Sequence, residues 1–174
     1  MTLDFRFHPE TLREVVDDPA ALRGRIDALA ASGVTESGDF GTRCEYVSLL
    51  RIAGRLDEAA LEGEMTLAAA DLTGDLRKMA RAMLLLGHVR QWRSEWPVAD
   101  ALFTRASKLA LYVDDDRLVA FAASDAGKNF YDQGHYVEAA LRFRLAVEIR
   151  TRIGAPTDLV ESARVALKAA VDQL

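Results

Sequence analysis

Small and aromatic residues recur along this 174-residue chain with a period of 40 residues, and this repeat is the strongest pattern in the sequence. One position of the repeat is always alanine, at Ala59, Ala99 and Ala139. The second and third blocks also share an Ala-x3-Phe-x2-Ala motif, which ends at Ala106 in one block and at Ala146 in the other. Residues at these spacings lie on one stripe of a helix, where small side chains admit a neighbouring helix and the ring fills the space between them. The pattern therefore predicts a repeated helical hairpin.

Each block reads as two helices separated by a short turn. In the third block we predict a first helix from about 116 to 133 and a second from about 137 to 152, with Gly154 ending the second. Pro97 falls in the first turn of the corresponding helix of the second block, where proline is tolerated. The acidic run 114–116 is expected to be a solvated turn that caps the next helix, because a calcium loop needs alternating ligands and a glycine. The predicted repeats cover about residues 40–75, 76–115 and 116–155.

The two ends of the chain are expected to pack on this stack. Residues 157–174 read as one helix without a second helix behind it, which is the usual way to cap a solenoid. Thr157 or Asp158 is expected to cap the start of that helix. Residues 1–38 read as an N-terminal arm and a helical segment that packs on the repeats of residues 39–174, with helix predicted from Pro9 to Ala31 and interrupted at its internal proline.

The arm itself has an alternating pattern. Leu3, Phe5 and Phe7 alternate with charged residues, which is typical of an extended segment with one apolar side. Two placements stay open: the arm tucks under the first helix of its own chain, or it docks into the groove of another subunit. Residues 32–41 contain three glycines and are expected to form a loop or hinge.

The second and third blocks resemble the tetratricopeptide repeat (TPR), whose signature is an apolar residue, Leu-Gly, an aromatic residue, then Ala-x3-Phe and a further alanine. The matching residues are Met83, Leu86, Gly87, Ala99, Phe103 and Ala106, and then Ala123, Gly127, Phe130, Ala139, Phe143 and Ala146. The first block is degenerate and carries Val47, Gly63 and Thr66 where glycine, an aromatic residue and alanine are expected. The 40-residue period is similar to the long repeats of kinesin light chains and of bacterial Rap-type regulators. The resemblance implies an all-α fold: a right-handed superhelical stack of antiparallel helical hairpins with a C-terminal capping helix.

The resemblance also implies a protein-protein interaction module, and the repeat register indicates where it binds. In such a solenoid the first helix of each hairpin lines the concave surface. The columns of that surface collect basic and aromatic residues: Arg51, Arg81, His88, Trp92, Lys128, Tyr131 and Lys168. Arginine and lysine bind carboxylates, and aromatic rings supply contact area, so we predict a groove for an extended or helical peptide with acidic groups. The alternative is that these are ordinary solvated residues and that Trp92 packs on the following hairpin.

Two further sets of residues bear on the choice of partner. The carboxylate clamp of chaperone-tail binders in the TPR family is not matched, because its columns hold Cys44, Ser48, Leu85, Phe121 and Asp125. Four arginines on the last outer helix are expected to form a solvated face with Glu148: Arg142, Arg144, Arg150 and Arg152.

The composition fits this architecture and narrows the class of partner. Alanine and leucine, both strong helix formers, are abundant, and the formal net charge of −5 argues against nucleic acid as the main partner. The N-terminus lacks the apolar run of a secretory signal, and no apolar stretch approaches the length of a membrane span. Cys44 is the single cysteine, which suits a reducing compartment. We therefore expect a cytoplasmic protein with no membrane contact.

The sequence offers no convergent catalytic chemistry. The three histidines fall in different predicted elements, and no zinc-helix, nucleophile-elbow or phosphate-loop motif occurs. Cys44 neighbours Glu45, whose carboxylate disfavours a thiolate nucleophile. His8, Glu10 and Glu14 are metal-ligand types, but a helix start explains them more simply. We expect no enzyme activity, no cofactor and no metal. The alternative to a binding module is a structural scaffold that forms homo-oligomers, such as a homodimer, through the arm or the terminal helix.

Overall fold

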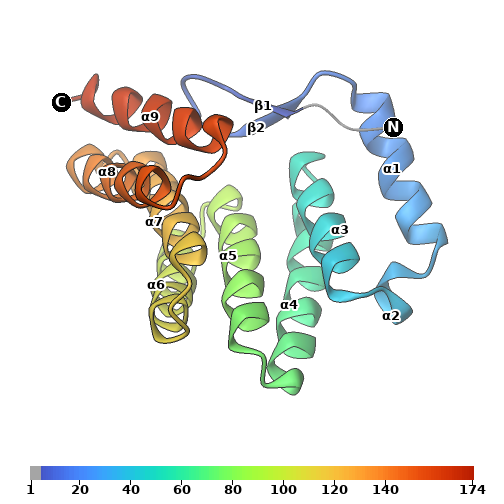
Figure 1. The fold of residues 1–174 in the computed structure, drawn as a ribbon. Coiled ribbons are helices and arrows are strands. Elements are labelled where there is room, and N and C mark those ends of the chain that lie inside the picture. Colours follow the sequence, from blue (N-terminus) through green and yellow to red (C-terminus); the bar gives the residue numbers. More distant parts are fainter. Residues whose placement is uncertain (1–4) are drawn as a thin grey trace.

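The computed structural model describes residues 5–174 and contains a curved stack of antiparallel helical hairpins (Figure 1). A short β-hairpin and two helices come first: β1 (Phe5–Phe7), β2 (Glu14–Val16), α1 (Pro19–Ala31) and α2 (Val34–Ser37). The stack follows: α3 (Phe40–Ile52), α4 (Leu56–Thr73), α5 (Leu76–Trp92), α6 (Trp96–Tyr112), α7 (Asp116–Asp132), α8 (Tyr136–Arg152) and α9 (Thr157–Val171). The predicted all-α solenoid is confirmed. Within the described residues, no helix is both long and apolar enough to cross a membrane.

The 40-residue register is the packing register of the helices. The repeated alanines Ala59, Ala99 and Ala139 have no exposed surface, as the pattern predicted. Gly87 faces the ring of Phe103, and a Cβ added there would lie only 2.5 Å from Cε1 of that ring. Each Leu-Gly or Ala-Gly step of an inner helix therefore gives the aromatic ring of its outer helix a place to pack.

In the degenerate first repeat the large and the small residue of this contact exchange places: the larger residue is on the inner helix and the glycine is on the outer helix. Val47 occupies the column of the inner-helix glycine, and Gly63 occupies the column of the outer-helix phenylalanine. Val47 is fully buried, and its Cγ1 lies 3.7 Å from the position a Cβ of Gly63 would take. Thr66, where alanine is expected, is buried because its hydroxyl donates to the carbonyl of Glu62 at 2.7 Å. The first hairpin thus keeps the architecture without the signature.

The helix boundaries follow from caps and left-handed turns. Asp75 and Asp115 cap α5 and α7 by accepting backbone N–H groups, so the acidic run before α7 is the predicted capping turn. The turns repeat at φ values from +53 to +77°, and two of these positions are not glycine, namely Ser94 and Asp114. The expected cap at Thr157 or Asp158 is wrong, since α9 begins directly after Pro156 with no side-chain cap.

Helix α9 closes the stack. Ala166 and Ala170 on α9 are buried against Ala139, Ala140 and Phe143 of α8. This placement covers the last hairpin, as expected for a capping helix.

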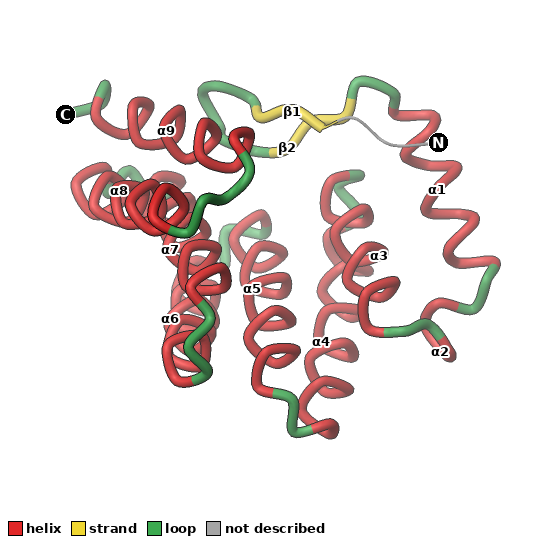
Figure 2. Tube along the Cα trace, viewed as in Figure 1, coloured by secondary structure: helices red, strands yellow, loops and turns green. Residues whose placement is uncertain are grey.

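The N-terminal helix predicted from Pro9 is wrong over its first half. Residues 5–7 and 14–16 instead pair as antiparallel strands, with Phe5 opposite Val16 (Figure 2). Leu12 has a left-handed backbone (φ 55°) and is buried against α8 and α9, which a helix through this segment would not allow. Pairing of aromatic with β-branched residues favours the strands. The extended arm is thus part of a hairpin on its own chain, Leu3 lies outside the described residues, and the predicted loop 32–41 contains α2.

Candidate binding groove

The concave side of the stack holds a cavity of about 1090 Å³, which we call the inner groove. The inner helices α3, α5, α7 and α9 line it, and Phe7, Leu12 and Glu14 of the β1–β2 hairpin segment line its covered end. Figure 1 shows this hairpin running between α9 and α1. Its apolar lining includes Leu84, Leu85, Leu118, Phe121 and Val165. Its cationic lining includes Arg51, Arg77, Arg81, Arg117 and Lys128. The groove is therefore both apolar and cationic within an acidic chain.

The structure brings four of the predicted site residues together and leaves three outside. The four predicted residues that line the inner groove are Arg51, Arg81, His88 and Lys128. Trp92 lies under the hairpin, stacked by the guanidinium groups of Arg13 at 5.1 Å and Arg51 at 4.7 Å. Tyr131 packs edge-on against Tyr136 at 5.3 Å between ring centres, and the exposed Lys168 pairs with Asp172 on its own helix. The prediction that these residues bind a peptide stays a prediction.

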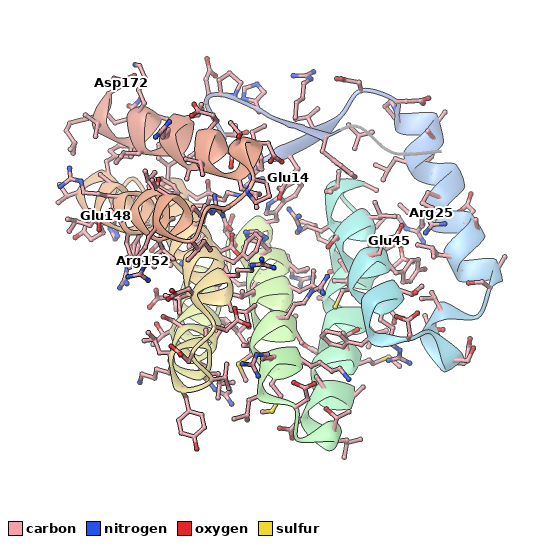
Figure 3. All side chains as sticks on the ribbon, in the orientation of Figure 1. Glu14, Arg25, Glu45, Glu148, Arg152 and Asp172 are labelled. Atoms are coloured by element: carbon pink, nitrogen blue, oxygen red, sulfur yellow. The ribbon has the colours of Figure 1, made fainter. Side chains whose placement is uncertain are left out.

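A carboxylate from the hairpin fills the covered end of the groove. Glu14 Oε2 accepts a hydrogen bond from Arg51 Nη1 at 2.9 Å, and Glu14 Oε1 lies 4.0 Å from Lys128 Nζ (Figure 3). Burial alone would raise the pKa of Glu14, but Lys128, Arg51 and His88 outweigh it and hold that pKa far below its ordinary value. Glu14 is therefore a carboxylate at any physiological pH.

A second charged pair lies beside this cluster. His88 Nε2 on α5 is 2.9 Å from Asp125 Oδ1 on α7. Burial would raise the pKa of Asp125, yet the charge of His88 beside it lowers that pKa. His88 is thus positioned by a carboxylate of its own stack, and the pair joins two adjacent inner helices.

Three more contacts fix the hairpin over the groove. Leu12 is buried in the apolar cluster formed by α8 and α9, and Arg13 donates to Asp132 on α7 at 3.1 Å. Lys128 Nζ lies 4.7 Å from the ring centre of Phe7. Sequence reasoning missed Glu14 and Leu12 as groove residues, because only their distant partners show what they contact.

The other end of the groove stays uncovered and keeps unpaired cations. Arg77 is held by Asp115 at 3.3 Å, but within residues 5–174 Arg81 and Arg117 form no ion pair. Arg81 lies 6.0 Å from the ring centre of Phe40, and the ring of Phe121 is 39% exposed. This uncovered end therefore offers positive charge beside aromatic surface.

The position of Arg150 differs from the one predicted from the sequence. The repeat register predicts it on a solvated outer face, but it is buried, lines the inner groove and donates to the carbonyl of Leu159 at 2.7 Å. Its guanidinium lies 5.4 Å from the ring centre of Phe121, and burial lowers its pKa. The reason is its place in the last turn of α8, where the chain turns back toward α9. Arg152 pairs with Asp116 instead.

The thiol and the metal-ligand types are held by burial and by ion pairs in the described chain. Cys44 is buried, and burial raises the pKa of its thiol, which disfavours the nucleophilic thiolate. Among residues 5–174, no cluster of three or more His, Cys, Asp or Glu side chains has the arrangement of a metal site. Glu14, considered as a metal ligand, faces two cations instead.

Comparison with known proteins finds a repeat family that matches part of the chain and a solved structure with a similar fold. Residues 78–152, covering α5 to α8, match the family model "Tetratricopeptide repeat". A solved structure, described as the crystal structure of BtubC (BKLC) from P. vanneervenii, is similar with a TM-score of 0.65 at 18% identity. The match covers 88% of this chain and 66% of that one. No curated protein matches the sequence.

Proposed function

Since residues 78–152 match the tetratricopeptide repeat and the chain has the fold of such repeats, we propose that it is a protein-interaction module that binds an acidic segment of a partner protein in the inner groove. Such repeats are generally protein-interaction modules, because stacked hairpins present a continuous concave surface. The acidic character of the partner is our addition. It rests on the charge of the groove rather than on the family.

The uncovered cations carry the proposal. Arg81 and Arg117 have no carboxylate partner in the described chain, and they line the same groove as Phe121, which is 39% exposed. A groove of about 1090 Å³ suits a short segment with one or two apolar side chains better than a folded domain. An acidic residue next to an aromatic or aliphatic one would pair with an arginine while its neighbour covers the ring.

Peptide selection tests this function and does not require an identified partner. Random peptides displayed on phage are selected on the immobilised full chain, and we expect enrichment of Asp or Glu next to an apolar residue. The double substitution Arg81→Glu and Arg117→Glu should abolish binding of the selected peptides. Arg105→Glu with Arg144→Glu, on the exposed faces of α6 and α8, makes the same charge change away from the groove and should leave binding unchanged.

Two outcomes would contradict the proposal. Selected peptides without an excess of acidic residues would remove the charge argument. Equal binding by the groove variant and the outer-face variant would place the binding surface elsewhere.

Self-association through the arm is the less favoured function. The hairpin of residues 5–17 is anchored on its own chain by Leu12 and Glu14, so the arm has a partner without a second copy. The groove also offers little for catalysis, since its thiol is buried and its histidine is held by Asp125. We therefore favour a binding module over a homo-oligomeric scaffold or an enzyme.

A further inference from the structure

The β1–β2 hairpin divides the inner groove into a covered end and an open end, and the covered end is built as a binding site. Arg51 on α3 and Lys128 on α7 converge from the first and third hairpins of the stack on one carboxylate. That carboxylate, Glu14, belongs to a segment outside the repeats. The occupied site thus shows which chemistry this surface accepts.

We propose that residues 5–17 are a displaceable internal ligand of the inner groove, and that an acidic partner segment gains the Arg51–Lys128 subsite by displacing Glu14. This inference rests on the proposed function and adds its regulation. The ligand it assigns to the subsite is a carboxylate preceded by an apolar residue, as Leu12 precedes Glu14.

The subsite is not fully satisfied by its internal occupant. The Arg51 side chain is only 4% exposed, and its Nε is buried with no hydrogen-bond partner among the described residues. Lys128 Nζ, at 4.0 Å from Glu14 Oε1, is beyond hydrogen-bond distance. A carboxylate that approaches Arg51 side-on could accept from both Nε and a terminal nitrogen, which Glu14 does not do. A partner can therefore bind this subsite better than the hairpin does.

The hairpin is held by few anchors. Its strands are three residues each, and isolated two-stranded hairpins are marginally stable in water. Leu12 is the one residue of 5–17 that is buried, while Phe5 and Phe7 remain largely exposed. The two middle core clusters, which lie in α4 to α9, contain no hairpin residue, whereas Leu12 and Val16 each pack on a cluster at one end of the stack. Release is therefore a local event.

Electrostatics couples release to the arrival of another acid. A hairpin that leaves alone would break the pairing of Glu14 with Arg51 and Lys128 without replacing it. Exchange of one carboxylate for another keeps the pairing with Arg51 and Lys128. If the hairpin fills the subsite in about 99% of molecules, partner binding is about 100-fold weaker than to the open groove, because the apparent affinity scales with the fraction of molecules in which the subsite is open.

A labelled synthetic peptide of residues 5–17 is the probe for the subsite. Fluorescence anisotropy measures its binding to full-length variants. The Glu14→Gln protein should bind the peptide at least tenfold more tightly than the wild type, because its own hairpin no longer fills the subsite. The same peptide with Gln at position 14 should lose that gain. Glu10→Gln, on the exposed loop of the hairpin, makes the same change away from the groove and should behave as wild type.

A second variant and a second readout keep the test decisive. Leu12→Ala removes the buried apolar anchor of the hairpin and leaves Arg51 and Lys128 intact, so it should also tighten peptide binding. Hydrogen exchange should show amides of residues 5–17 losing protection in both variants, while α3 to α8 keep theirs.

The inference is overturned if neither variant binds the peptide more tightly than wild type, or if the hairpin amides stay protected in both. The proposed function has its separate test at Arg81 and Arg117. Peptide selection that depends on those arginines, together with a hairpin that never opens, would leave the function standing and remove only the regulation.

Discussion

Substituting Gly87 with alanine tests the packing contact on which each repeat depends. The new Cβ would lie 2.5, 2.9 and 3.0 Å from three ring carbons of Phe103, where carbon atoms normally approach to about 3.5 Å. The ring is 1% exposed and close-packed, so it must shift by about 1 Å against its neighbours. Overpacking of this kind costs about 3 kcal/mol at the upper end, and alanine returns about 1 kcal/mol of helix propensity.

The expected net loss is therefore about 2 kcal/mol, or a fall in Tm of roughly 4–8 °C for a chain of this size. Urea unfolding followed by far-UV circular dichroism measures it. Gly24→Ala is the matched control, because Gly24 is exposed in α1 with nothing within 4 Å of a new Cβ, and it should stabilise by about 0.5–1 kcal/mol.

A double-mutant cycle isolates the clash from other effects. Phe103→Leu alone should destabilise, but in the Gly87→Ala background it should cost less, because the smaller side chain relieves the overlap. Additive losses, or a Gly87→Ala protein as stable as Gly24→Ala, would refute the reasoning about this contact.

Two other predictions concern a turn and a charge. Ser94 has a φ of 60° at a repeat position otherwise occupied by Gly54 and Gly134. Ser94→Gly should therefore raise the free energy of unfolding by up to about 1 kcal/mol, measured by urea unfolding. A lower free energy of unfolding would contradict the strain argument. In the folded chain, burial would raise the pKa of Glu14, but Lys128, Arg51 and His88 lower it, and Asp125 lies close by. The contribution of the Glu14 carboxylate to hairpin docking is therefore present above its ordinary pKa of 4.5. That contribution should be lost as the pH falls from there toward the lowered pKa, seen as a change in the emission of Trp92 that is absent from Glu14→Gln; a step centred near neutral pH would contradict it.

The repeat architecture was predictable because its contacts are written at fixed spacing. Gly87 and Phe103 lie sixteen positions apart, as do Gly127 and Phe143, and both pairs meet as the register requires. Val47 looked like a departure from the signature, yet the exchange of volumes with Gly63 preserves the contact.

The N-terminal hairpin was not predictable by the same means. Leu12, Val15 and Val16 have the spacing of a helical face as well as the β-branched character of a strand. What decides between them is the burial of Leu12 against α9 and the pairing of Glu14 with Arg51, thirty-seven residues away. Neither contact leaves a local trace in the sequence.

The groove was predictable where the repeat columns place its lining residues. Arg51 and Lys128 were placed by their repeat columns, which the hairpin cannot change. Trp92 and Tyr131 lie at the last turns of their helices, where the hairpin and α8 cover them. Arg150 was assigned to the wrong face, because the end of the stack turns its helix terminus toward α9.

The central claim is that a partner binds between the inner helices, and site-specific photocross-linking tests it most directly. Benzoylphenylalanine placed at position 121 reports on the inner groove, and at position 112 it reports on the outer side, since Tyr112 on α6 is 78% exposed. After irradiation in native lysate, the cross-linked segment is identified by mass spectrometry. We expect position 121 to capture an acidic segment that position 112 does not. Cross-links from position 112 alone, or to a segment without acidic residues, would contradict the account.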